Sequence, residues 1–293
     1  MRVKRVKLLA ALGAAGAVAA AVPLLLPSQA EALTGYVVAS ADSGADSAGN
    51  KSATARCPSG RRAVAGGGYA WNATPRPHLG GFKIGSDSTG DFVTARGSEG
   101  QSGTTGTWAV SAYAVCATAP AGLEIVTASA SASTPTQTVT ATCPAGKHLI
   151  GLTANLSGQG WGQVLLTGLT PLPGLAGAVA EAAEDQNGVS ETWTLTAQAV
   201  CVSPISGVVE VRTSSPGYGA TGTGGAGMLP DCPPSRNVYG VGGRVVGSTG
   251  NAFLTRLAHF GPGTSIGKAN IESSPDADGA PDGFRTEAVL ICL

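Results

Sequence analysis

Apolar and polar residues alternate strictly in the segment that ends each third of this chain. Residues 108–116 read Trp-Ala-Val-Ser-Ala-Tyr-Ala-Val-Cys, so Trp108, Val110 and Cys116 fall on one face and Tyr113 on the other. A period of two residues is typical of a β-strand. Both faces are fairly apolar, which favours an interior position in a sheet.

Five further strands are predicted in each third, from short β-branched or apolar runs between glycine, proline and serine breakers. They are an opening strand at 36–39, 123–128 and 208–212, a second that ends at a cysteine, as at 139–142, a third at 63–69, 149–156 and 238–246, a fourth at 82–84, 163–169 and 252–258, and a fifth at 92–96, 176–181 and 265–271. Residues 175–185 are alanine-rich and compatible with a helix, but their alignment with the other fifth strands favours a strand. Loops are predicted at 43–50, 97–106, 214–227 and 273–283.

The cysteines indicate that the three thirds are copies of one repeat. The spacing within successive pairs is 59, 58 and 60 residues, and the first cysteine of a pair recurs after 86 and then 89 residues. Each first cysteine is followed by proline and, four positions on, by a basic residue; each second cysteine follows an aromatic residue by eight positions. Self-similarity at a fixed period is the signature of repeats.

This spacing selects one disulfide pairing from the fifteen that six cysteines allow. The predicted bonds are Cys57–Cys116, Cys143–Cys201 and Cys232–Cys292. Metal sites are the alternative, but there is no Cys-x-x-Cys pair, and His78, His148 and His259 occupy unrelated positions. We therefore expect disulfides and no metal or other cofactor.

The fold class expected is all-β, with three homologous disulfide-closed repeats at 33–119, 120–205 and 206–293. Short joins at 117–122 and 202–207 favour repeats that touch. Two architectures fit: a single pseudo-threefold β-prism-like body, which we favour, and three small β-sandwiches in tandem.

The first 32 residues are predicted to form a secretory signal peptide. A basic start is followed by an apolar run at 8–26 and by small-x-small cleavage sites ending at Ala30 and Ala32. Such a run is also long enough for an uncleaved anchor, although Pro23 and the cleavage sites favour cleavage. The expected location is extracellular, where disulfides persist.

Charge excludes two classes of partner for the mature chain. Removing the signal takes four basic residues and one acidic residue from 18 of each, which leaves 14 basic and 17 acidic residues. A weakly negative protein does not attract nucleic acid or an anionic membrane. The 44 glycines suit short strands joined by tight turns.

The Cys-Pro-x-Gly openings at Cys57 and Cys143, the glycine turn after them and the strand ending in cysteine resemble the vitelline membrane outer layer protein I family. The third repeat departs from the pattern, with Ser235 in place of the glycine. The resemblance covers only the ends of each repeat. It implies a threefold β-prism and an association with oligosaccharides, and it assigns no functional residues here. The composition and signal also resemble secreted actinobacterial repeat proteins.

No catalytic constellation is evident, so we expect a protein that is not an enzyme. There is no Gly-x-Ser-x-Gly motif, and none of the three histidines lies in a hydrolase motif. Acidic residues cluster at Asp87 and Asp91, at 181–185 and at 276–282, without equivalence between repeats. Asp276 and Asp278 faintly match a calcium loop but lack its closing glutamate. Solvated loop charge is the simpler interpretation.

Aromatic residues in glycine-rich surroundings are the candidates for binding: Tyr69, Trp71, Asn72 beside them, and Trp161. Exposed indoles stack on sugar faces, although a loop tryptophan more often folds back onto the core. Trp108, Trp193 and Phe284 occupy equivalent positions and are expected in the core. The sequence favours a binding protein for cell-wall or extracellular polysaccharide with one weak site per repeat; a structural coat protein and, least of all, a hydrolase are the alternatives. The oligomeric state is left open.

Overall fold

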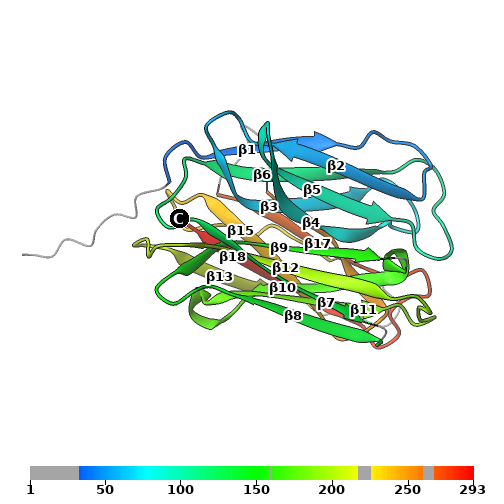
Figure 1. Ribbon diagram of the computed structural model, residues 1–293. Helices are drawn as coiled ribbons and strands as arrows, with labels where there is room; N and C mark the ends of the chain where they lie inside the picture. The colour runs from blue at the N-terminus through cyan, green and yellow to red at the C-terminus, as the bar shows by residue number, and fades with distance from the viewer. Residues whose placement is uncertain (1–32, 133, 159, 217–225, 260–266) are drawn as a thin grey trace, which may run out of the picture.

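The computed structural model describes residues 33–132, 134–158, 160–216, 226–259 and 267–293 (Figure 1). The predicted signal peptide, residues 1–32, lies outside the described residues, as do parts of the predicted loop at 214–227 and of the predicted strand at 265–271. Among the described residues, no helix is long and apolar enough to cross a membrane.

Strands are the main regular structure of the described residues, six in each repeat. Repeat 1 contains β1 (Val37–Asp42), β2 (Asn50–Arg56), β3 (Arg62–Trp71), β4 (His78–Asp87), β5 (Gly90–Ser98) and β6 (Ala109–Ala117). Repeat 2 contains β7 (Glu124–Ala132), β8 (Thr136–Thr142), β9 (His148–Gly158), η1 (Trp161–Gln163), β10 (Val164–Pro171), η2 (Pro173–Leu175), β11 (Gly177–Glu184) and β12 (Trp193–Val202). Repeat 3 contains β13 (Val209–Ser214), β14 (Ala226–Met228), β15 (Val238–Val246), β16 (Ala252–His259), β17 (Ala269–Pro275) and β18 (Arg285–Cys292). The all-β prediction is confirmed, and the alanine-rich segment is strand β11.

Three antiparallel six-stranded sheets are built from these strands, and every sheet joins two repeats. Sheet I has the order β1-β6-β3-β16-β17-β14, sheet II the order β2-β5-β4-β9-β12-β7, and sheet III the order β13-β18-β15-β10-β11-β8. Repeat 1 therefore contributes three strands each to sheets I and II, repeat 2 to sheets II and III, and repeat 3 to sheets III and I. This arrangement closes a ring, is consistent with a threefold β-prism-like body and excludes three independent sandwiches.

The repeats meet at the centre of each sheet through very short pairings. In sheet I, β3 and β16 pair only at Tyr69–Arg256 and Gly68–Leu257. Strands β4 and β9, and strands β10 and β15, also pair over two residues each. Gly81 lies in one such seam with φ of +107°, and a Cβ there would lie 2.2 Å from the carbonyl oxygen of Ala154. Only glycine permits that approach without strain.

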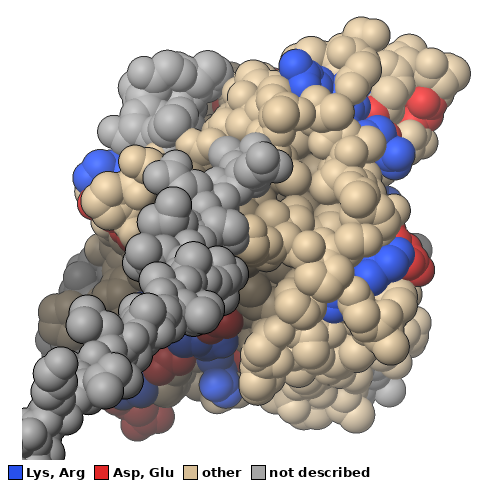
Figure 2. All heavy atoms as spheres, turned by 90° about the vertical axis from the view of Figure 1, so that its left-hand side faces the viewer, with Lys and Arg blue, Asp and Glu red and all other residues tan. Residues whose placement is uncertain are grey.

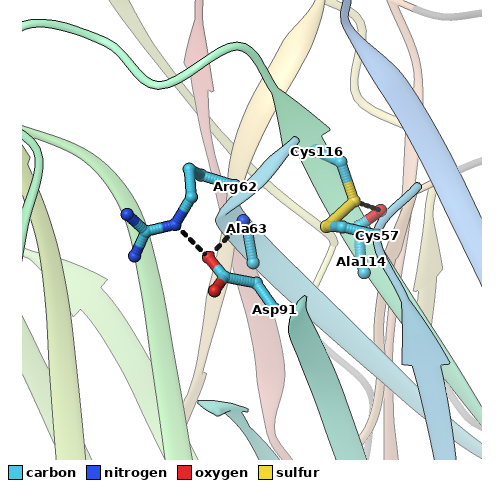
Figure 3. The surroundings of a disulfide bond; sticks show 6 residues. All are labelled: Cys57, Arg62, Ala63, Asp91, Ala114 and Cys116. Carbon is cyan, nitrogen blue, oxygen red and sulfur yellow. Dashed lines mark hydrogen bonds and ion pairs between the residues drawn. A yellow bond between two sulfur atoms is a disulfide. The ribbon is translucent and has the colours of Figure 1, made fainter. Parts of the chain in front are cut away.

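Each disulfide joins the two sheets that its repeat helps to build. The predicted pairing is confirmed: the bonds are Cys57–Cys116, Cys143–Cys201 and Cys232–Cys292. Figure 3 shows the first, beside the buried carboxylate of Asp91, which accepts hydrogen bonds from Arg62 Nε at 2.7 Å and the amide of Ala63 at 3.0 Å. The three disulfides are consistent with an oxidising, extracellular location.

The core lies between the sheets and includes the three aromatic residues expected there. Trp108 and Trp193 have no exposed surface and Phe284 is 4% exposed. The strand before each second cysteine is interior, as predicted: β6, for example, lies between β1 and β3. At the end of the molecule that carries the C-terminus, the charged side chains visible in Figure 2 lie mainly toward the margins, with uncharged residues between them.

Candidate binding face

Two of the predicted site residues lie together on the outer face of sheet I. Tyr69 and Trp71 are alternate residues near the end of β3, and both are partly exposed. Their ring centroids are 6.4 Å apart and their planes differ by 23°. Ala70, between them, is fully buried, so the opposite face of β3 is core. Both residues therefore belong to a strand; Tyr69 was predicted at the end of the strand at 63–69, whereas Trp71 was expected in a glycine-rich loop.

Hydrogen bonds fix the indole of Trp71 on this face. Trp71 Nε1 donates to Ser111 Oγ on β6 at 2.9 Å, and Ser111 Oγ donates to Asp42 Oδ1 on β1 at 2.5 Å. Tyr113, two residues from Ser111, is partly exposed on the same face. The chain of bonds holds the indole across three neighbouring strands, so that its orientation is set before any ligand arrives.

An arginine from repeat 3 extends the aromatic row across the seam. The guanidinium of Arg256, on β16, lies 3.2 Å from the ring centroid of Tyr69, in a cation–π contact. Arg256 Nη1 donates to Glu272 Oε1 at 2.6 Å, and Arg76 Nη1 donates to the other oxygen of Glu272 at 3.2 Å. The Glu272 carboxylate thus links a cation from repeat 1, Arg76, with one from repeat 3, Arg256.

Asn72 lies at the rim of a surface hollow next to this row. The hollow has a volume of about 680 Å³ and lies between the β3–β4 loop of repeat 1 and the β17–β18 loop of repeat 3. Its lining includes Tyr69, Asn72, Pro75, Thr105, Ser274 and Asp276. Asn72 has φ of +77°, a conformation that asparagine tolerates better than most residues. The hollow places amide, hydroxyl and carboxylate groups beside the exposed ring of Tyr69.

Trp161 does not belong to this face. It begins the 3-10 helix η1 in the β9–β10 loop, and its side chain lies outside what the structure describes. The next residue, Gly162, accepts a long hydrogen bond of 3.5 Å from Ser98 Oγ of repeat 1. Trp161 therefore belongs to the seam of sheet II, whereas Tyr69, Trp71 and Asn72 surround the seam of sheet I.

The pseudo-threefold symmetry shows that the aromatic set is not repeated. Equivalent positions lie at the same distance before the second cysteine on β6, β12 and β18, or pair with such a position on β3, β9 and β15. By this alignment, Tyr69 corresponds to Asn155 in repeat 2 and to Arg244 in repeat 3. By the same count Trp71 corresponds to Ser157 and Val246, and Tyr113 corresponds to Gln198 and Val289. At these described positions, only sheet I carries aromatic side chains. The structure thus supports one candidate site, and not one in each repeat.

The residues of this face that the sequence analysis missed include Tyr113, Arg256 and Glu272. Tyr113 could have been found, because its position in the alternating segment puts it opposite the core-facing Trp108. Arg256 and Glu272 carried no signal, because their place beside Tyr69 depends on a two-residue pairing between the first and last repeats.

Burial shifts the pKa of several titratable groups in the described part of the chain. His78 and His259 are buried, and burial lowers the pKa of each to about 4. Burial raises the pKa of Asp276 and Asp185. No group of three or more His, Cys, Asp or Glu side chains that could hold a metal ion occurs among the described residues. The chain matches no protein-family model and no curated protein.

Proposed function

We propose that this chain is an exported, non-enzymatic binding protein that recognises an extracellular polysaccharide on the outer face of sheet I. The observation that carries the proposal is the pair of partly exposed, nearly parallel rings of Tyr69 and Trp71, whose planes differ by 23°. Aromatic faces are electron-rich, and the C–H-bearing face of a pyranose ring packs on them without losing hydrogen bonds to water.

Polar groups of the type that sugar hydroxyls require surround these rings. Asp42 and Glu272 offer carboxylate acceptors, and Asn72 offers an amide that both donates and accepts. Arg76 offers further N–H donors at the hollow. An apolar platform with a few fixed polar groups is the usual composition of a specific ligand site. Because only one face carries the rings, the affinity of one molecule is expected to be modest.

The test is retention of the oxidised mature protein by insoluble cellulose, chitin, xylan and bacterial cell-wall peptidoglycan. Replacement of both rings, by Tyr69→Ala/Trp71→Ala, is expected to lower retention on the preferred polymer at least tenfold. Trp161→Ala is the matched control, because Trp161 belongs to the loop between β9 of sheet II and β10 of sheet III, and its replacement is expected to leave retention unchanged. Thermal denaturation of each variant confirms that the fold is retained.

Two results contradict the proposal. One is that the wild-type protein is retained by none of these polymers. The other is that the Tyr69→Ala/Trp71→Ala variant stays folded and is retained as well as the wild type. In either case, the rings on sheet I would be packing residues that cover Ala109 and its neighbours on β6.

A further inference from the structure

The edges of the three sheets differ in how well they are protected against pairing with another chain. Proteins block exposed edges with charges, with proline or by keeping the strand short. Five of the six edge strands follow this rule. Edge strands β1, β2, β7 and β13 contain charged residues, and β14 has three residues. The exception is β8, whose seven residues read Thr-Gln-Thr-Val-Thr-Ala-Thr.

The backbone groups on the free side of β8 belong to its threonines. Cys143, the residue after β8, donates its amide to Ala176 O before β11, so it points inward. Because backbone groups alternate along an antiparallel strand, those of residues 141, 139 and 137 also point to β11. The outward groups are those of Thr136, Thr138, Thr140 and Thr142, and all four residues are exposed. Consistently, side-chain donors of Thr134 and Gln137 reach the carbonyl oxygens of Thr136 and Thr138.

We propose that β8 is a self-association edge, which pairs antiparallel with β8 of a second copy of this chain about a twofold axis at Val139. The outward groups belong to even-numbered residues, so an even residue must face an even residue of the partner copy. With Val139 on the axis, Thr138 faces Thr140 and Thr136 faces Thr142 of the other copy. This is the register that uses all four outward threonines.

The side chains fit this pairing on both faces of the sheet. Val139 is 5% exposed and faces the core, so the two copies align their cores without exposing a polar group. On the outer face, threonine would oppose threonine. The chain already makes such hydroxyl pairs between strands of sheet II, at 2.9 Å for Thr54 with Thr94, Ser129 with Thr196 and Ser131 with Thr194. Strand β8 contains no charged residue, so pairing with a second copy places no like charges opposite each other.

The second copy is favoured over an unrelated strand because the sequence of β8 is nearly symmetric about Val139. A twofold interface needs a surface that complements itself, and threonines at equal distances on both sides of the axis provide it. In Figure 1, β8 runs along the lower margin of the molecule, where a neighbour can approach. One strand pair buries less than the roughly 1,200 Å² of a stable interface, so the dimer is expected at high protein concentration only.

Sedimentation of the oxidised mature protein over a range of concentrations tests this proposal. The wild type is expected to shift reversibly from monomer to dimer as concentration rises. Thr140→Pro is expected to abolish the shift, because it removes an outward N–H and leaves the pairing of β8 with β11 intact. Thr54→Pro is the matched control: it lies three residues before Cys57 as Thr140 lies before Cys143, on the free side of β2. It is expected to leave the dimer unchanged.

The register is tested separately by oxidative cross-linking. Thr138→Cys/Thr140→Cys is expected to give a covalent dimer, because these positions face each other across the axis, whereas Thr138→Cys alone is expected to give little. A wild type that stays monomeric up to its solubility limit would overturn the proposal. So would a dimer that persists in a folded Thr140→Pro variant, which would place the contact elsewhere. The polysaccharide site lies on sheet I and β8 on sheet III, so either proposal can fail without the other.

Discussion

At the scale of single residues, two buried tryptophans depend on glutamates that lie nine positions before them. Trp108 Nε1 donates to Glu99 Oε1 at 3.2 Å, and Trp193 Nε1 donates to Glu184 Oε1 at 3.0 Å. In repeat 3 the equivalent positions hold Phe284 and Pro275, and a phenyl ring has no N–H to donate. The carboxylate is therefore present in the two repeats whose buried ring carries a donor.

Loss of one of these carboxylates should leave a buried indole N–H without an acceptor. We expect Glu184→Ala to lower the free energy of unfolding by about 1–3 kcal/mol, the usual cost of such an orphaned donor. Glu184→Gln retains an oxygen acceptor and should cost less. Urea denaturation measures both, and repeating Glu184→Ala in a Trp193→Phe background supplies the control. An equal loss in that background would show that the hydrogen bond is not the cause.

The buried histidines should make the protein sensitive to mild acid. Because the folded pKa of His78 and His259 is about 4, below the ordinary value of 6.5, folding keeps both rings neutral. This contribution to stability is complete above pH 6.5 and is lost as the pH falls toward 4. Each ring can account for up to about 3 kcal/mol over that range.

Chemical denaturation at pH 7.5, 6.5 and 5.5 measures this effect, because carboxylates with ordinary pKa values stay charged over that interval. We expect little change in the free energy of unfolding between pH 7.5 and 6.5 and a clear decline between pH 6.5 and 5.5. His259→Gln should reduce the slope, since an amide can still donate to the carbonyl oxygen of Tyr239, which lies 2.9 Å from His259 Nε2. His148→Gln is the control, because His148 is exposed. A slope that is the same in all three proteins would contradict the assignment.

Residues of the candidate face could be predicted from sequence only where they are local. Tyr69, Trp71 and Asn72 lie within four positions of one another, so their aromatic and polar character stood out directly. Arg256 completes the same face from 187 positions away, and nothing in its neighbourhood indicates a tyrosine beneath it. Trp161 was grouped with Trp71 by glycine-rich surroundings alone, and such a similarity carries no information on which seam a loop borders.

At the scale of elements, most strands could be predicted because the cysteines align three copies of each. A strand with weak periodicity in one repeat, such as β11, was identified by its alignment with the fifth strands of the other two repeats. The bulge in each third strand was not foreseen. It falls at Val64, Ile150 and Tyr239, the second residues of the apolar pairs after each first cysteine. All three are fully buried, so an apolar pair looks the same in sequence whether the strand is regular or bulged.

Close approach between third strands can be tested at Gly151 in β9. A Cβ at this position would lie 2.1 Å from Val64 O and 2.8 Å from Ala65 Cβ on β3. Both contacts are too short, and one is to backbone that cannot rotate away, so Gly151→Ala should destabilise the protein by about 2 kcal/mol or more. Gly227→Ala is the matched control, since its nearest contact is Glu272 Cγ at 3.6 Å. Equal melting temperatures for the two variants would show that β3 can shift to make room.

At the scale of the whole molecule, the choice between one body and three tandem sandwiches could not be made from sequence. Disulfides within each repeat fit both architectures. The difference lies in three seams of two residue pairs each, which leave no local pattern. In the structure, the first and last repeats also meet at Tyr36, whose hydroxyl donates to Val238 O at 2.8 Å and whose ring contacts Tyr239 edge-on at 5.1 Å. A ring closed in this way should unfold as one unit.

The uneven distribution of tryptophans among the repeats makes this cooperative unfolding measurable. The four tryptophans, Trp71, Trp108, Trp161 and Trp193, all lie in repeats 1 and 2, so their fluorescence does not report directly on repeat 3. Replacing both cysteines of the third disulfide, in Cys232→Ala/Cys292→Ala, removes a crosslink that spans 60 residues of repeat 3. In the chain-entropy model its loss costs about 4 kcal/mol.

If the shared sheets couple the three repeats, loss of this disulfide lowers the free energy of unfolding of the whole molecule. Tryptophan fluorescence from repeats 1 and 2 should then shift to lower urea concentration together with the circular dichroism of the full chain, in one transition, because sheets I and III each lose three strands when repeat 3 unfolds. Independent sandwiches would behave differently: the fluorescence midpoint would stay at its wild-type value while circular dichroism showed an earlier step for repeat 3 alone. Reduced wild-type protein, which lacks all three crosslinks, sets the largest shift to be expected.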